Sequence, residues 1–455
     1  MVTDHRSQSC CLLSTGNESR HERVNVRSDN LGGRIRTVSC MDFTALHQAL
    51  GREPALITDD MLDEAVACDV EEADGLDWKS ELPEEKDLAR SDVVKDIAAM
   101  ANSGGGLIVF GVTETQGGAT GRMDVGEVTE SYERTLRRVA VSGIQPPVFG
   151  LGVRRLGEEP KRALAVVVPE SVDGPHLVYR GEYFGAPVRN HADTEWMKER
   201  QIEAAYRARF EDRQAADRAL AAMYDEIAAG HTSAERAWML GVVRPRLPRV
   251  GHKRMTRDEA RAVFGEAHRI APGYADTKGR HPIESVDVHN PRPGLRRWVA
   301  PTTTTERPTS AWKAAGAAVH DDGSVTLAAA VGAAPSRDGN GHEPAWLVHS
   351  DRAERFVADL MALLRASSNH CGVGEFELRI GIEWSGEQSL SIQTTDQFGF
   401  PFPEASIPLA RYTPVMATVR TDVDNDGFKG QIWNLATDVV NQGGIEYLKT
   451  LRPPQ

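Results

Sequence analysis

Cysteines are scarce in this sequence, and their spacing argues against a metal-binding role. The chain of 455 residues contains five, which are too scattered to form a zinc motif. An odd number in a chain of this length is typical of reduced thiols, so we expect a cytoplasmic protein. The five are Cys10, Cys11, Cys40, Cys68 and Cys371.

Long apolar segments are also absent. No run approaches the roughly 18 apolar residues of a membrane-spanning helix, and the first residues lack the apolar core of a signal peptide. We therefore expect no membrane partner. The sequence contains no Gly-Lys-Ser/Thr phosphate-binding motif, no internal repeat and no Ser/His/Asp arrangement that supports a hydrolase.

Positive charge is in deficit. The chain has 53 lysines and arginines against 66 aspartates and glutamates, a formal net charge of −13. Bulk attraction to nucleic acid is therefore excluded, and any such binding would need a local basic patch. The apolar content of 40% and charged content of 26% are ordinary for a folded protein, and the length allows two or three domains.

The densest local signals lie between Glu71 and Val112. Ser91 is placed to cap a helix, and apolar residues then recur at helical spacing as far as three glycines at positions 104–106. Residues 107–112 form a short apolar run that is typical of a buried strand. Because the glycines follow a helix instead of preceding one, they favour a helix stop over a phosphate-binding loop.

An acidic cluster precedes this helix. If residues 75–79 are extended, Asp77 and Lys79 share one face. An Asp-Gly turn just before them would bring Glu72 back beside Asp77, and Glu114 follows the buried strand. Three converging carboxylates would raise at least one pKa unless a divalent cation joined them, and oxygen ligands without His or Cys suit Mg²⁺ or Mn²⁺. A solvated acidic loop is the alternative.

The motif Asp77-Trp78-Lys79, followed by the segment DIAAMANSGGGLIVFGV at 96–112, resembles the Schlafen AlbA-type domain. That family typically has Glu-Phe-Lys, then a helix ending in AxANxxGG and an apolar strand closing in Gly-Val. Weaker similarity continues through Tyr179-Arg180, residues 187–190 and the helix near 195–209. The resemblance implies a mixed α/β N-terminal domain, to which we add an α+β C-terminal domain of no recognised family.

The resemblance also implies function. Bacterial members are described as nucleic-acid-binding, often in proteins that resemble transcriptional regulators, and were once grouped with AAA ATPases. Some animal members are endoribonucleases with three carboxylates, which by position fall on Glu72, Asp77 and Glu114, while Asp77 and Trp78 depart from the family's Glu and Phe. Nucleic-acid binding in regulation or defence is the leading hypothesis. A Mg²⁺- or Mn²⁺-dependent endoribonuclease acting on structured RNA, with Lys79 offsetting developing charge, is the alternative.

ATP binding is a third hypothesis, and the missing phosphate loop argues against it. Phosphate contacts are expected from basic residues in both domains, although a solvated, charge-mixed surface is the competing interpretation. In the first domain the candidates are Arg137, Arg138, Arg180 and Arg189. In the second they belong to a proline-interrupted basic loop and are Arg246, Arg249, Lys253 and Arg254.

Patterning divides the chain into five parts. Residues 1–40 are polar and aperiodic and are expected to be disordered, and Met41 is a candidate natural start. A short helical lead-in at 41–64, the Schlafen AlbA-like domain at 65–210, a connector helix at 211–234 and the α+β domain at 235–455 follow. The apolar face of the connector leaves homo-oligomerisation open.

Four further local predictions concern helices and turns. Thr194 is expected to cap a helical region that reaches residue 229 and breaks near Asp212. A hairpin about Gly386 is expected to join strands at 376–384 and 389–394. The acids at Asp422, Asp424 and Asp426 indicate a tight turn rather than a calcium loop, and a final helix is expected at 432–441.

Overall fold

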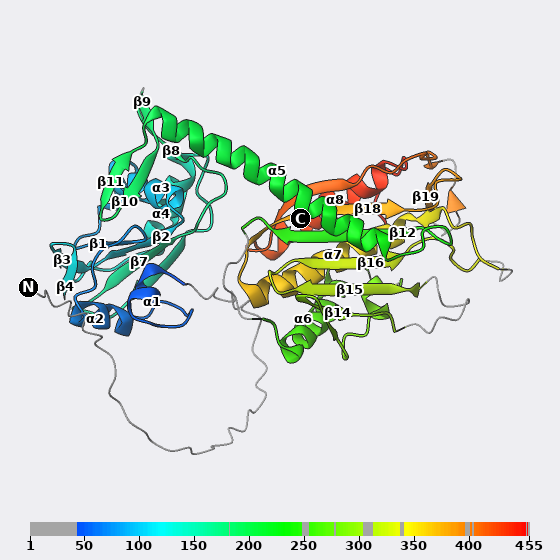
Figure 1. Ribbon diagram of the computed structural model, residues 1–455, viewed down its shortest axis with the longest axis horizontal. Helices are drawn as coiled ribbons and strands as arrows, with labels where there is room; N and C mark the ends of the chain where they lie inside the picture. Colours follow the sequence, from blue (N-terminus) through cyan, green and yellow to red (C-terminus); the bar gives the residue numbers. More distant parts are fainter. Residues whose placement is uncertain are drawn as a thin grey trace, which may run out of the picture.

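The computed structural model describes residues 43–181, 183–247, 254–276, 279–303, 313–336, 341–395, 401–402, 405–451 and 453. The expected disordered segment at 1–40 lies outside the described residues, as do Arg249 and Lys253. Both domains contain helices and sheets, which confirms the predicted fold class, mixed α/β followed by α+β. A long helix, α5 (Glu199–Ala229), runs from one lobe to the other (Figure 1).

A four-stranded sheet forms the centre of the first lobe. Its edge strand β1 is parallel to β2, whereas β7 and β6 follow as antiparallel neighbours. The residues of β2 alternate between two cores, so both faces of the strand are covered, as its unbroken apolar sequence predicts. In spatial order the strands are β1 (Leu76–Lys79), β2 (Gly106–Phe110), β7 (Ala163–Val168) and β6 (Gly152–Leu156).

Helices cover the two faces of this sheet. One face packs Ile108 and Phe110 against α3 (Val93–Asn102) and α4 (Glu130–Ser142). The other face packs Leu107 and Val109 against α1 and α2. The remaining elements of the lobe are α1 (Ala45–Ala49), α2 (Asp59–Ala67), η1 (Glu85–Arg90), β3 (Val112–Thr115), β4 (Gly118–Arg122), β5 (Ile144–Gln145), β8 (Leu177–Arg180), β9 (Tyr183–Gly185), β10 (Pro187–Asn190) and β11 (Asp193–Trp196).

The second lobe is built on a seven-stranded antiparallel sheet. Helix α7 (Ser350–Cys371) lies against one face, where Phe356 and Leu360 belong to the main core, and is almost wholly buried. In spatial order the strands are β13 (Arg292–Gly294), β14 (Arg297–Ala300), β15 (Ala315–His320), β16 (Val325–Ala330), β12 (Trp238–Pro245), β18 (Glu375–Glu383) and β21 (Val415–Arg420).

Two more helices join α7 in this core, and a small sheet flanks it. Helix α6 follows its N-cap Thr256, whose hydroxyl accepts a hydrogen bond from the Glu259 amide. The other elements are α6 (Arg257–Ile270), α8 (Asn425–Asn441), η2 (Ala271–Gly273), η3 (Pro282–Ser285), β17 (Leu347–His349), β19 (Ser391–Thr395) and β20 (Pro401–Phe402). No helix in the described part of the chain is both long and apolar enough to cross a bilayer.

Helix α5 covers the opposite face of the large sheet. Leu220 and Tyr224 pack on Leu240 and Val242 of β12, so the apolar face considered for self-association is buried within the chain. A glycine makes this contact possible, because a Cβ at Gly381 of β18 would stand 2.0 Å from the Tyr224 hydroxyl oxygen. That hydroxyl instead donates a 2.8 Å hydrogen bond to the Glu383 carboxylate.

Several local predictions were wrong. Thr194 lies in strand β11, and α5 passes Asp212 without a break. Ser91 does not cap α3, because its hydroxyl donates to the Leu88 carbonyl and the N-cap is Asp92. The last helix begins at Asn425 and not at 432, because Asp424 is its N-cap.

The expected hairpin about Gly386 was also wrong. Strand β18 pairs with β12 and β21, while β19 pairs with β17 in another sheet. Strands β18 and β19 are adjacent in the sequence but do not pair. Instead, β18 lies between β12 and β21, which are distant from it in the chain.

We expect Gly381→Ala to destabilise the second lobe by about 1–3 kcal/mol, because the added methyl overpacks the Tyr224 contact. Gly265→Ala is the matched control, since nothing lies within 4 Å of its Cβ position and alanine favours the helix by up to about 1 kcal/mol. Urea unfolding measures both variants. Equal stability of Gly381→Ala and the wild type would contradict the tight approach of α5.

Candidate functional site

A cleft of about 580 Å³ opens in the first lobe, where the end of β1, the start of α3, the β3–β4 turn and the β10–β11 hairpin meet. Most of its charged side chains are carboxylates, and we call it the acidic cleft. It is lined by Glu72, Asp77, Lys79, Asp92, Lys95, Asp96, Glu114, Gln116, Gly117, Arg189, Ala192, Asp193 and Thr194. All four residues predicted from the acidic cluster are among them.

The geometry of β1 directs these side chains. Trp78 is buried in the core beneath the sheet, and its indole Nε1 donates a 3.0 Å hydrogen bond to the Val70 carbonyl. Strand alternation therefore places Asp77 and Lys79 on the opposite face, as predicted. Both side chains line the acidic cleft on that face.

Two cations hold the carboxylate of Asp77, which is only 1% exposed. The Lys79 ammonium lies 2.7 Å from Oδ2, and Arg189 Nη1 lies 3.2 Å from Oδ1. Burial opposes the charge on Lys79, but the nearby Asp77 carboxylate raises its pKa above the ordinary value. Asp77 is thus a buried anion paired on both sides.

Arg189 corrects one prediction. We expected it at the surface as a phosphate contact, yet its side chain is 2% exposed and its charge is used on Asp77. Its Nε and Nη2 atoms have no hydrogen-bond partner among the described residues. The β10–β11 hairpin, which carries Arg189, folds over the cleft. Local sequence patterns do not predict the burial of Arg189, because its partner Asp77 is distant in the chain.

Glu72 reaches the cleft through the predicted turn. Ala73 and Leu76 exchange backbone hydrogen bonds of 3.2 and 3.0 Å, and the Glu72 carboxylate accepts a 2.8 Å hydrogen bond from the Trp78 amide. Burial raises the pKa of Glu72, and repulsion from Asp77 and Glu114 raises it further. Glu114 is exposed, and its carboxylate accepts a 3.0 Å hydrogen bond from the Gly117 amide.

Sequence reasoning missed Asp96. It lies in the first turn of α3 and is 4% exposed. Burial raises the pKa of its carboxyl group, and the nearby Asp77 charge adds to that effect. A charged residue on the apolar face of a predicted amphipathic helix was a signal that could have identified it.

The donor types in the acidic cleft suit a divalent cation, but their arrangement does not. In the part of the chain that the structure describes, no three carboxylates, histidines or cysteines stand close enough together to hold a metal ion. The two oxygens of Asp77 face Lys79 and Arg189 instead. The residues as placed therefore do not form a metal site.

Other predicted contacts lie elsewhere. Arg137 and Arg138 are exposed on α4, and Arg137 pairs with Glu133 at 3.3 Å. Arg254 is exposed just before α6. Arg180 ends β8, but its side chain lies outside the described residues.

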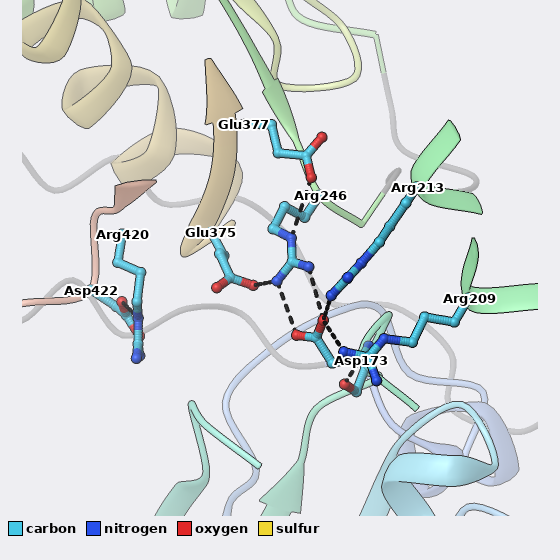
Figure 2. Close-up of polar contacts among 9 residues, drawn as sticks. Asp173, Arg209, Arg213, Arg246, Glu375, Glu377, Arg420 and Asp422 are labelled. Carbon is cyan, nitrogen blue, oxygen red and sulfur yellow. Dashed lines mark hydrogen bonds and ion pairs between the residues drawn. The ribbon is translucent and has the colours of Figure 1, made fainter. Parts of the chain in front are cut away.

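Arg246 is a second correction, because it is 11% exposed and joins the two lobes instead of facing solvent. Its Nη atoms each lie 3.0 Å from an oxygen of Asp173, and Nη1 lies 2.7 Å from Glu375. Arg213 of α5 also contacts Asp173, at 3.2 Å. Figure 2 shows the side chains of Asp173, Arg213, Arg246 and Glu375 converging from four segments, and we call them the Asp173 junction.

The glycine turn follows α3 and leads into β2, as predicted. Gly104 and Gly105 adopt left-handed φ angles of 91° and 86°. A Cβ on Gly105 would stand 2.6 Å from the Glu170 amide nitrogen. The turn is therefore a helix stop with close backbone packing, and no helix begins there to bind a phosphate.

We expect Asp77→Asn to destabilise the first lobe by about 3–5 kcal/mol, because Arg189 would remain buried without its counter-charge. Urea unfolding at neutral pH measures the loss. The double variant Asp77→Asn/Arg189→Met should recover part of it, since both members of the buried ion pair are then neutral. A single variant as stable as the wild type would show that the pair is not buried.

Asp96→Asn should have the opposite effect at neutral pH, stabilising the protein on the order of 1 kcal/mol. Because the folded state raises the pKa of Asp96, wild-type stability rises as the pH falls through that raised pKa toward the ordinary value of 3.8. The variant lacks this gain, so the difference in unfolding free energy between the variant and the wild type should shrink as the pH falls. Asp217→Asn on the exposed face of α5 is the control, and a constant difference across pH would contradict the assignment.

Comparison with known proteins identifies the lobe that contains the acidic cleft. Residues 72–198 match the family described as Schlafen, AlbA_2. The N-terminal domain of "Putative ATP-dependent DNA Helicase RecG-related Protein" from Nitrosomonas europaea is similar at 19% identity and a TM-score of 0.24, over 32% of this chain and 94% of that one.

The DIP2311 protein from Corynebacterium diphtheriae is similar at 14% identity and a TM-score of 0.24, over 47% of this chain and 33% of that one. No curated protein matches the sequence. The matched segment begins at Glu72 and ends just before α5, so it contains every charged residue of the acidic cleft. The acidic cleft thus lies within the segment of this chain that is similar to the family described as Schlafen, AlbA_2.

Proposed function

We propose that the AlbA_2 domain binds nucleic acid at the acidic cleft. The observation that carries this proposal is the coincidence of the family match at 72–198 with a cleft that gathers Lys79, Lys95 and Arg189 beside several carboxylates. A strand of nucleic acid would meet Lys79 and Lys95 first, because Arg189 is buried.

The charge of the cleft limits this binding. Six carboxylates and three cations line it, and residues 72–198 carry 21 acidic against 15 basic residues, a balance of −6. Phosphates approaching such a surface are repelled unless further positive charge arrives. Binding should therefore be weak, sensitive to salt and stronger when a divalent cation is present.

A metal-dependent endoribonuclease acting on structured RNA is the second candidate. The convergence of Glu72, Asp77, Lys79 and Glu114 in one cleft favours it. Since these residues as placed do not form a metal site, this candidate requires Glu72 and Glu114 to turn toward a divalent cation that arrives with the RNA. Glu114 is exposed and Glu72 is held by one backbone hydrogen bond, so both can turn without disturbing the core.

One substitution separates the two candidates. Glu114→Gln removes a negative charge, so simple binding of RNA or DNA should strengthen, by about twofold or more. If the domain cuts RNA with Mn²⁺, the same substitution should reduce cutting on the order of a hundredfold while binding is kept. Glu81→Gln, exposed and outside the cleft, is the control.

Filter binding across salt concentrations and gel analysis of structured RNA with Mn²⁺ or EDTA measure these outcomes. Lys95→Gln should lower the salt slope by about 0.7–0.9, the loss of one phosphate contact, whereas the exposed Lys86→Gln should not. Absence of binding near micromolar protein at low salt, with or without Mn²⁺, would refute the proposed function. Mn²⁺-dependent cutting that survives Glu114→Gln would refute the second candidate's site.

A further inference from the structure

The second lobe contains a small cavity of about 180 Å³ that the proposed function does not use. It lies where the first turn of α7, the segment leading into η3 and the paired strands β15 and β16 meet. We call it the α7 pocket. It is lined by Gly279, Arg280, Pro282, Ser285, Lys313, Ala314, Ala315, Ala329, Ala330, Val331, Asp351, Arg352 and Arg355.

Cations dominate the polar wall of the α7 pocket. Arg280, Lys313, Arg352 and Arg355 line it, with Asp351 as the one acidic residue among the lining side chains that the structure describes. Negative charge from Asp276 lies just behind, 3.1 Å from Arg355 Nη2. The carboxylates of Asp351, Asp276 and Glu343 thus lie near four cations, which leaves the described part of the site with an excess of positive charge.

Arg355 is the side chain that most needs a further partner. It is 4% exposed, and its Nη1 atom donates to the Asp351 carboxylate at 2.7 Å. Its Nε atom has no hydrogen-bond partner among the described residues. A buried guanidinium with an unused N–H carries a desolvation penalty that an anion in the adjoining cavity would remove.

Arg352 adds positive charge to the same wall. Burial lowers the pKa of its guanidinium, although Asp351 and Glu343 oppose this effect. The first turn of α7 adds backbone amides without intrahelical acceptors and the positive end of a helix of 22 residues.

The opposite wall is apolar and made of small residues. Ala315 of β15 and Ala329 and Ala330 of β16 leave room because alanine side chains do not fill it. The volume corresponds to roughly six water molecules at about 30 Å³ each. A ligand that fits has one oxyanion group for the arginines and a compact carbon body for the alanines.

We propose that the α7 pocket is a binding site for a small organic oxyanion, either a phosphorylated or a carboxylated metabolite. The guanidinium groups of Arg280 and Arg352 would bind the oxyanion, and Arg355 would donate through its Nε. Arg280 is already oriented, since its Nε donates to the Ser285 hydroxyl at 3.1 Å. The site is independent of the nucleic-acid cleft and survives if that proposal fails.

Isothermal titration of the full chain with inorganic phosphate, glycerol 3-phosphate and succinate tests the site, at constant ionic strength with chloride as the reference anion. We expect saturable binding of at least one probe, tightest for an organic oxyanion that also fills the alanine wall. Tighter binding of glycerol 3-phosphate identifies a phosphorylated ligand, and tighter binding of succinate a carboxylated one.

Arg280→Gln and Arg352→Gln should each weaken that binding about tenfold or more, because each removes a charged contact. Arg261→Gln, on the exposed side of α6, is the matched control and should bind like the wild type. The Arg280 side chain lies on the pocket wall and donates to the Ser285 hydroxyl, so its variant is expected to fold, and the unfolding midpoint without ligand verifies this. No saturable binding of any probe at about 10 mM, or equal binding by Arg280→Gln and the wild type, would overturn the proposal.

Discussion

The first lobe depends on one buried charge. Asp77 stands on an edge strand between Lys79 and Arg189, so the strand, the cleft and the β10–β11 hairpin share a single electrostatic contact. The attraction must offset the desolvation of two buried ions, which is only achieved when the geometry holds. Arg189 is 112 residues from Asp77 in the chain, so this contact joins two distant segments of the first lobe at the acidic cleft.

Two further acids lie close to that pair. Glu72 and Asp96 are buried or half-buried carboxyls whose pKa values are raised, mainly by burial. Groups of this kind lower stability at neutral pH, and they persist where a protein needs a polar constellation. These carboxyl groups therefore lower the stability of the first lobe at neutral pH.

Local patterns predicted much of this molecule. The alternation in β1, the turn before it and the glycine stop after α3 are encoded within a few residues, and each is found where the sequence indicated. The pairing of β18 and the burial of Arg189 were not predictable in this way, because both depend on segments far apart in the chain. Asp96 was overlooked because its neighbours all suggested an ordinary core helix. A basic run in the sequence predicts that Arg246 is exposed to solvent. It is only partly exposed because its acidic partners, Asp173 and Glu375, come from other segments of the chain.

The Asp173 junction has a mechanical consequence. One carboxylate from the first lobe receives arginines from α5 and from the second lobe, so the contact between the lobes is largely ionic where these segments meet (Figure 2). Ionic contacts near a surface weaken as the salt concentration rises. The apolar packing of α5 on the large sheet does not weaken in this way. We therefore expect the two lobes to keep one relative orientation at low salt concentration. At high salt concentration we expect them to move relative to each other about the start of α5.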